Sequence, residues 1–191
     1  HLLHNDLRLT VLTRNPTQAR AVFEGAFDLD WVDWHQGEIT SFAYPDGHFS
    51  HLIHAATPAR ASLNDNDPTQ MLDITVLGTK RALEFAKAAG VSRFLLTSSG
   101  AVYGPQPADL YGVDEDFRGF VDPMDPKNAY ALGKLTAEHY CRHFSSPGLS
   151  CLIARCFAFV GPGLPLDEHF AIGNFIGDAL QGRDIIIKGD G

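Results

Sequence analysis

Short apolar runs alternate with longer amphipathic segments along most of this chain. Short apolar runs bounded by turn residues are typical of buried strands, and we expect strands over residues 7–13, 29–34, 50–54, 91–99, 149–157 and 184–188. Helical spacing of apolar residues, with proline near the start and glycine near the end, predicts helices over residues 17–25, 67–90, 128–144 and 169–182. The alternation of the two kinds of element predicts an α/β fold: a doubly wound parallel sheet with helices on both faces.

The helix expected over residues 128–144 carries a tyrosine and a lysine four positions apart, Tyr130 and Lys134. At this spacing both side chains leave the same face, one turn apart. A phenol is ordinarily a poor acid or base near neutrality, but a nearby ammonium favours the phenolate and so suits a proton-transfer role. Taken alone, the pair is also compatible with a helical tyrosine beside a solvated lysine. The apolar run upstream, however, ends in a hydroxyl cluster, Thr97-Ser98-Ser99, followed by Gly100-Ala101.

Together, residues 94–104 and 128–144 resemble the extended short-chain dehydrogenase/reductase superfamily, in particular its NAD-dependent epimerase/dehydratase branch acting on nucleotide sugars. The resemblance implies a catalytic role for Ser99, Tyr130 and Lys134. Tyr130 would remove the hydroxyl proton as hydride leaves a sugar carbon, Lys134 would support Tyr130 and bind the nicotinamide ribose, and Ser99 would stabilise the developing ketone oxygen.

The resemblance also implies a domain organisation. A Rossmann-like NAD(P)-binding domain would cover residues 1–160, and residues 161–191 would begin a substrate-binding domain. No Gly-x-Gly-x-x-Gly sequence occurs in the chain, and residues 7–13 read as the second strand of such a fold. We therefore expect a fragment that lacks the first strand and the glycine-rich loop, with a truncated substrate-binding region.

The end of the strand over residues 7–13 is where relatives choose between NAD and NADP. An acid there binds the ribose hydroxyls, whereas an arginine accommodates the 2′-phosphate. Here Thr13 stands where relatives often have Asp, and Arg14 follows, which leans toward NADP; a merely solvated Arg14 would leave NAD open. By resemblance, the expected cofactor contacts are Arg14, Glu38, Ile39, His54, Ala55, Ala56, Thr97, Tyr130, Lys134 and Phe157. We expect His54 to support its loop rather than to perform chemistry.

The residues after the catalytic serine bear on the reaction. Nucleotide-sugar 4,6-dehydratases carry Asp-Glu where this chain has Gly100-Ala101, and related decarboxylases carry Glu at the second position. The lack of these carboxyls favours an epimerase or a keto-reductase. The expected substrate contacts are Ser99, Gly100, Ala101, Tyr130, Ala158 and Asn174.

Two further features have expected roles. We expect Ser98 to make only a turn or cap hydrogen bond. Near the end of the chain, Gly189-Asp190-Gly191 matches a further family motif.

Two alternatives remain at this point. An NADPH-dependent reductase of a non-sugar carbonyl compound is favoured by Arg14 and by Ala158, which replaces the family's sugar-contacting Asn. The family motif at residues 189–191 and the long loop over residues 105–126 favour the nucleotide-sugar enzyme instead. A non-catalytic nucleotide-sensing protein would have no need of Tyr130 and Lys134 together.

The composition of the chain limits the classes of partner that we expect it to bind. The 191 residues are 45% apolar and 20% charged, as in an ordinary globular domain. The net charge of −8 argues against nucleic acids and anionic membranes as partners, and no apolar run approaches the ~20 residues of a membrane span. The three cysteines lack metal-ligand spacing, so we expect no metal and buried thiols in a reducing, cytoplasmic environment. By resemblance we expect a homodimer formed through the helices over residues 68–89 and 128–144.

Overall fold

The computed structural model describes residues 7–25, 28–57, 61–107, 110–161, 164–167 and 171–187. The strands are β1 (Leu9–Thr13), β2 (Val32–Gln36), β3 (His51–His54), β4 (Arg93–Ser99) and β5 (Ser150–Cys156). The helices are α1 (Pro16–Phe23), α2 (Ala61–Asn66), α3 (Pro68–Ala88), α4 (Ala129–Phe144) and α5 (Ala171–Leu180). Two short 3₁₀ helices, η1 (Gly100–Tyr103) and η2 (Pro126–Asn128), follow β4 and precede α4.

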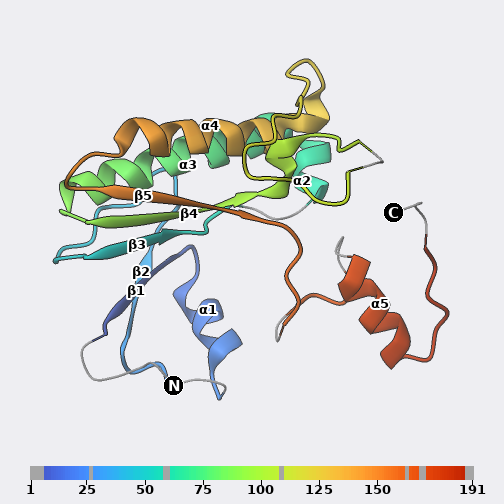
Figure 1. The fold of residues 1–191 in the computed structure, drawn as a ribbon. Helices are drawn as coiled ribbons and strands as arrows, with labels where there is room; N and C mark the ends of the chain where they lie inside the picture. Colours follow the sequence, from blue (N-terminus) through green and yellow to red (C-terminus); the bar gives the residue numbers. More distant parts are fainter. Residues whose placement is uncertain are drawn as a thin grey trace.

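All strand pairs are parallel, as expected, but they form two sheets instead of one (Figure 1). The smaller sheet pairs β1 with β2, and the larger has the order β3-β4-β5. These are the two outer parts of the strand order 3-2-1-4-5-6 of dinucleotide-binding folds, in which the strand numbered 1 lies between them. Among the described residues, β1 and β3 each have one edge without a strand partner. The α/β, Rossmann-like character is confirmed.

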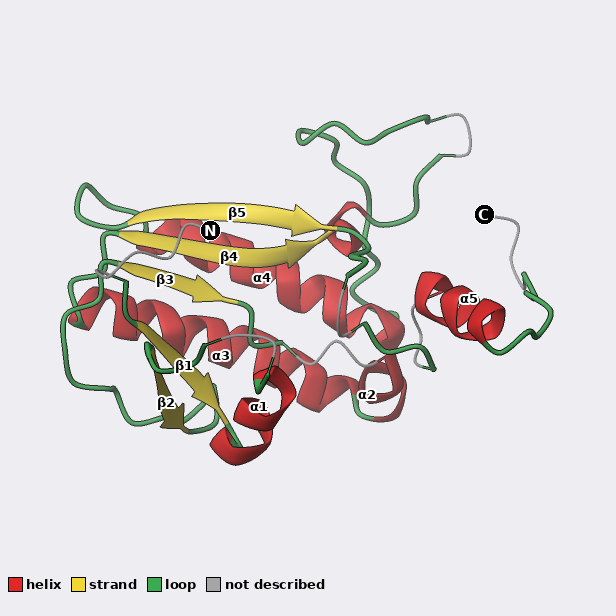
Figure 2. Cartoon of the chain, turned by 90° about the horizontal axis from the view of Figure 1, so that it is seen from below, coloured by secondary structure: helices red, strands yellow, loops and turns green. Residues whose placement is uncertain are grey.

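Helices α3 and α4 cover one face of the larger sheet (Figures 1 and 2). The buried core between them is apolar and includes Leu83 and Ala86 of α3, Phe94 of β4 and Ala137 of α4. Each large apolar side chain buried there stabilises the fold by roughly 1.5–3 kcal/mol. This core fixes the position of α4, the helix that carries Tyr130 and Lys134.

Individual residues explain where α3 begins and why α3 and α4 pack closely together. Asp67 caps α3 by accepting a hydrogen bond from the backbone N of Gln70 at 2.9 Å, and Pro68 occupies the first turn. On α4, a side-chain carbon at Gly133 would lie only 3.0 Å from carbons of Thr75 on α3. Glycine at position 133 therefore lets α4 approach α3 closely, next to Lys134.

The structure corrects the expected elements at two places. Residues 184–187 form no strand, and the isoleucines 185–187 are at least half exposed, because no described strand lies beside them to complete a ladder. Helix α2 was not expected, because its polar sequence lacks a helical apolar stripe. Helix α5 lies beyond the carboxyl edge of the larger sheet (Figure 2). The segments 1–6, 168–170 and 188–191, including the Gly189–Gly191 motif, lie outside the described residues.

The composition-based expectations concern thiols and membranes. Cys141 is buried, Cys151 and Cys156 are half-buried, and all three are free thiols. Among the helices that the structure describes, none combines the length and apolar character needed to span a bilayer.

Candidate functional site

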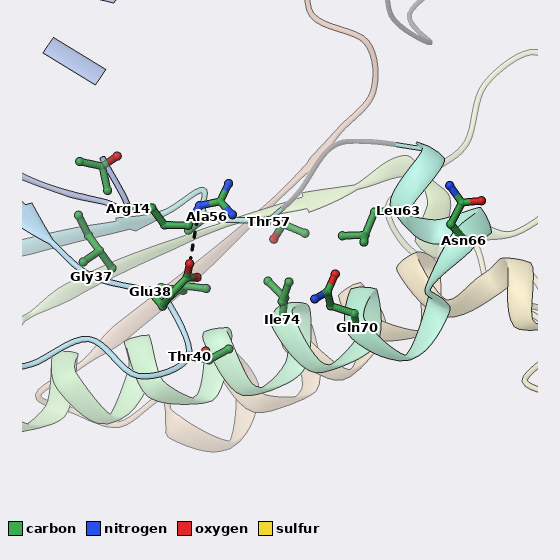
Figure 3. Close-up of a pocket in the computed structure, with 13 residues that line it drawn as sticks. Arg14, Gly37, Glu38, Thr40, Ala56, Thr57, Leu63, Asn66, Gln70 and Ile74 are labelled. Atoms are coloured by element: carbon green, nitrogen blue, oxygen red, sulfur yellow. Dashed lines mark ion pairs between the residues drawn. The ribbon is translucent and has the colours of Figure 1, made fainter. Parts of the chain in front are cut away.

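A cavity of about 800 Å³ opens beside the carboxyl ends of β1, β2 and β3 (Figure 3). Its walls come from the end of β1, the turn after β2, the segment after β3, and helices α2 and α3. In open α/β sheets this is the edge at which ligands bind, and the volume lies within the usual range for small-molecule sites. Four of the expected cofactor contacts line the cavity: Arg14, Glu38, Ile39 and Ala56.

Arg14 and Glu38 face each other at this cavity (Figure 3). Arg14 Nε lies 3.8 Å from Glu38 Oε1, and the two side chains are 79% and 53% exposed. An ion pair with this exposure contributes little to stability, about 0–1 kcal/mol. The guanidinium can therefore exchange Glu38 for an anionic group of a ligand at small cost.

Lys134 is held between the cavity wall and the end of β4. Its ammonium donates to the carbonyl oxygen of Thr97 at 2.7 Å and to Oγ1 of Thr57, a cavity-lining residue, at 3.0 Å. The same nitrogen lies 5.7 Å from the ring centroid of Tyr130, so the two side chains do share one face of α4. An ammonium has three donors, so one remains for a ligand. Lys134 thus connects the cavity to Tyr130.

Burial affects the charge of Lys134. The side chain is 3% exposed, and burial lowers its pKa from 10.5 to about 8 because the charged form loses hydration. The thiol of Cys156 acts more weakly in the opposite direction. Lys134 remains mostly protonated at neutral pH, as a partner of a phenolate requires.

His54, at the end of β3, is buried and neutral. Its Nε2 lies 3.0 Å from Oγ1 of Thr79, and this hydroxyl donates its single proton to the carbonyl of Thr75 at 2.7 Å. His54 Nε2 must therefore carry a hydrogen and donate it to Thr79. Burial, assisted by the positive charge of Lys134, lowers the pKa of His54 from 6.5 to about 4. The imidazole ties β3 to α3, which is a supporting arrangement for the loop that follows.

The two serines at the end of β4 form different hydrogen bonds, and that of Ser98 differs from the expected one. Ser98 is buried, and its hydroxyl donates to Oε1 of Glu138 on α4 at 2.6 Å, so the expected turn or cap bond of Ser98 is wrong. Instead, Oγ of Ser99 accepts the cap bond from the backbone N of Ala101 at 3.2 Å. Alternate residues of a strand point to opposite faces, which directs Ser98 toward α4. Since the oxygen of Ser99 accepts this bond, its hydroxyl hydrogen remains available to a substrate oxygen.

An aromatic ring occupies the space next to Gly100. A side-chain carbon at Gly100 would lie 2.5–2.9 Å from three ring atoms of Phe157. The ring of Tyr103 stacks on Phe157, with centroids 6.3 Å apart and planes 17° apart. The place that a carboxyl-bearing side chain would take at position 100 is thus filled by Phe157.

The remaining expected contacts are not among the residues that line the cavity. Ala101 and Ala158 are exposed near the carboxyl ends of β4 and β5. Ala55 is exposed next to the cavity-lining Ala56, and Thr97 accepts the bond from Lys134. Asn174 is half-buried on α5 and does not line the cavity.

Several residues at the site were missed from the sequence. Thr57, Asn66 and Gln70 line the cavity, yet they lie in polar stretches that resemble ordinary turns and helix starts. Glu138 was detectable, because it stands four residues after Lys134 and so on the same face of α4. Its partner Arg155 on β5 could be found only in three dimensions.

The fold and the site define a class: a parallel α/β nucleotide-binding fold with a tyrosine and a lysine one turn apart, the lysine bonded to a residue of the cavity wall. A model of the NAD dependent epimerase/dehydratase family matches residues 1–191. The chain belongs to this family.

Individual relatives agree with that assignment. The chain is 32% identical over 141 residues to UDP-glucuronic acid decarboxylase 1 of Xenopus tropicalis, covering 73% of this chain and 33% of that protein. Its fold is similar to that of UDP-glucuronic acid 4-epimerase from Bacillus cereus in complex with UDP-glucuronic acid and NAD, with a TM-score of 0.74, 21% identity and coverage of 96% and 58% of the two chains. The fold is also similar to that of RMD from Pseudomonas aeruginosa complexed with NADPH, with a TM-score of 0.59 and 26% identity. This match covers 93% of this chain and 62% of that chain. The chain thus spans about a third of the length of that decarboxylase and under two thirds of the two solved chains.

Proposed function

We propose that this chain provides the cofactor-binding and catalytic part of a nicotinamide-dependent enzyme that transfers hydride at a sugar carbon of a nucleotide sugar. The observation that carries the proposal is the position of Lys134. Its ammonium contacts the cavity through Thr57, the strand that ends at Ser99 through Thr97, and the ring of Tyr130. One cation therefore lies between the wall of a ligand cavity, the strand that ends at Ser99 and the ring of Tyr130.

The cavity fits a dinucleotide in chemistry and in place. It lies at the carboxyl ends of parallel strands, and it combines apolar walls such as Ile39 with hydrogen-bonding groups such as Asn66 and Gln70. Arg14 supplies a cation at the end of β1, where a 2′-phosphate would be recognised. Related proteins support such a cofactor, since solved structures of the same fold contain NAD or NADPH. We propose NADP as the preferred form, with NAD as the alternative.

The chain's own side chains perform the proton chemistry. Tyr130 accepts the proton of the substrate hydroxyl, and the ammonium of Lys134 stabilises the phenolate. Ser99 donates its hydroxyl hydrogen to the substrate oxygen as that oxygen gains negative charge. A bound nicotinamide supplies the hydride acceptor and donor. The hydrogen bond from Lys134 to the carbonyl of Thr97, two residues before Ser99, supports this assignment of roles.

The surroundings of Gly100 favour epimerisation or keto-reduction over 4,6-dehydration. Elimination of water uses an acid and a base next to the reacting carbons. Here the space at position 100 is filled by the ring of Phe157, and position 101 is alanine. The described end of β4 therefore offers hydroxyl groups but no carboxyl at these two positions.

Titration of the purified protein with NAD and NADP, followed by fluorescence, tests the cofactor. We expect NADP to bind more tightly, and Arg14→Ala to weaken NADP binding by about tenfold more than NAD binding. Arg20→Ala, an exposed arginine on α1, is the matched control. Tighter binding of NAD by the wild type would assign NAD, equal loss for both cofactors would show that Arg14 does not recognise the 2′-phosphate, and binding of neither would overturn the proposal. Turnover is then measured on UDP-glucose and UDP-glucuronic acid against simple ketones.

Decarboxylation of a nucleotide-linked uronic acid is the second candidate, because a UDP-glucuronic acid decarboxylase is 32% identical to this chain, although Ala101 stands where related decarboxylases carry Glu. Oxidation two carbons from a carboxylate yields a β-keto acid, which loses carbon dioxide readily. The two candidates differ in product: release of carbon dioxide from UDP-glucuronic acid assigns decarboxylation, whereas conversion without it assigns epimerisation.

A further inference from the structure

The side-chain amide of Asn64, on α2, joins this helix to the start of α4. Its Oδ1 accepts a hydrogen bond from the backbone N of Tyr130 at 3.0 Å. Its Nδ2 donates to the carbonyl oxygen of Lys127 at 2.7 Å. Both atoms of one amide are thus bonded to the segment that leads into the helix of Tyr130, more than sixty residues away in sequence.

Helix α4 has no capping bond from its own N-cap side chain. The first N–H groups of a helix lack partners within the helix and need acceptors from elsewhere. Asn128 occupies the N-cap position, but its side chain makes no cap bond and donates instead to the carbonyl of Asp122 at 3.0 Å. Asn64 replaces the missing cap from another element, at the backbone of Tyr130 itself.

The same short helix also forms part of the cavity wall. Leu63 and Asn66, on either side of the Asn64 position, line the cavity assigned to the cofactor. Helix α2 therefore lines the cavity on one side and is bonded to the backbone of Tyr130 on the other. Asn64 therefore lies between the cavity wall and the first turn of the helix that carries Tyr130.

We propose that Asn64 is a positioning residue that sets the phenol of Tyr130 for proton transfer, an inference that rests on the proposed function. Proton transfer needs the phenol oxygen within hydrogen-bonding distance of the substrate hydroxyl, and a displacement of about 1 Å is enough to reduce the rate strongly. Without its acceptor at residue 64, the first turn of α4 frays and Tyr130 moves with it. The rest of α4 is held by the core and by Glu138, so cofactor binding through Lys134 persists.

Steady-state kinetics on the purified protein test the proposal. Asn64→Ala removes both bonds, Asn64→Asp keeps an acceptor for the Tyr130 amide, and Asp65→Ala changes an exposed neighbour on α2 as the matched control. We expect Asn64→Ala to lower kcat by about tenfold, with cofactor Kd within about twofold of the wild-type value. Asn64→Asp should restore part of kcat, because it keeps the acceptor for the Tyr130 amide but places an oxygen against the carbonyl of Lys127. A purely structural cap would lower Tm and leave kcat unchanged well below Tm, and that result would overturn the proposal.

Amide hydrogen exchange separates this inference from the proposed function. The Tyr130 amide should exchange faster in Asn64→Ala than in the wild type, by about tenfold, and should regain protection in Asn64→Asp. This readout does not depend on turnover. If the wild type converts no nucleotide sugar but the exchange pattern holds, the proposed function fails and the coupling of Asn64 to Tyr130 stands. If the Tyr130 amide exchanges at the same rate in all variants, the inference about Asn64 fails.

Discussion

Glu138 of α4 and Arg155 of β5 form a two-point ion pair, with N–O distances of 3.0 Å and 2.8 Å. The same carboxylate accepts the hydroxyl of Ser98, and another nitrogen of Arg155 donates to the carbonyl of Glu115 at 2.8 Å. Hydrogen bonding to Glu138 raises the pKa of Arg155, so the guanidinium stays charged. The network ties together α4, β4, β5 and the loop before α4, directly beside Ser99.

Removing the carboxylate of this pair should destabilise the protein. Glu138 is 10% exposed and Arg155 28%, so Glu138→Ala leaves a partly buried guanidinium without its carboxylate partner. We expect the free energy of unfolding, measured by urea denaturation, to fall by ~3 kcal/mol. Glu84→Ala, which breaks an exposed pair with Lys80 on α3, should cost less than about 0.5 kcal/mol. Equal losses in the two variants would contradict a stabilising role for the buried network.

Tyr130→Phe removes one hydroxyl and should abolish turnover while leaving cofactor affinity nearly unchanged. The phenol oxygen is the proton acceptor, whereas Lys134 keeps its bonds to Thr57 and Thr97. Tyr140→Phe, a half-buried tyrosine further along α4, is the control and should retain activity. Activity assays with parallel cofactor titrations check the prediction, and wild-type turnover by Tyr130→Phe would remove the assignment.

The buried imidazole of His54 predicts a pH-dependent stability. Its pKa falls from 6.5 in the unfolded chain to about 4 in the folded protein. Between these values the unfolded state binds more protons, so the free energy of unfolding decreases as the pH falls from 6.5 to about 4, by up to ~3 kcal/mol. In His54→Gln this part of the pH dependence should disappear, while the exposed His51→Gln should keep it. The free energy of unfolding is measured against pH for the wild type and both variants. If the curves of the wild type and His54→Gln have the same shape, His54 is not the titrating group.

Gly100 and Phe157 should be energetically coupled. Gly100→Ala places a methyl group within 2.9 Å of the Phe157 ring, which must rotate away. The ring is 65% exposed and can move, so we expect a loss of only about 1 kcal/mol in stability. In a Phe157→Ala background the same substitution should cost nothing further. A double-mutant cycle by chemical denaturation measures this coupling, and strict additivity would contradict the contact.

Much of the fold was predictable because its signals are local. Helical periodicity, Asp67 with Pro68 at a helix start, and apolar runs indicate α3, α4 and the strands without reference to the rest of the chain. The apolar run at residues 184–188 carried the same signal but formed no strand over 184–187, since a strand also needs a partner with which to pair. Local pattern therefore predicts the type of an element more reliably than its pairing.

Some features of the candidate site could likewise be predicted from local sequence, and others could not. A spacing of four residues in a helix dictates that Tyr130 and Lys134 share one helix face, so this feature could be predicted from the amino-acid order alone. The bonds of Lys134 to Thr57 and Thr97, the contact of Ser98 with Glu138 and the cap that Ser99 forms arise instead from the packing of the folded chain. The same is true of the cap that Asn64 provides for the helix of Tyr130. These relationships depend on burial and on contacts between segments distant in the chain, which no local spacing contains.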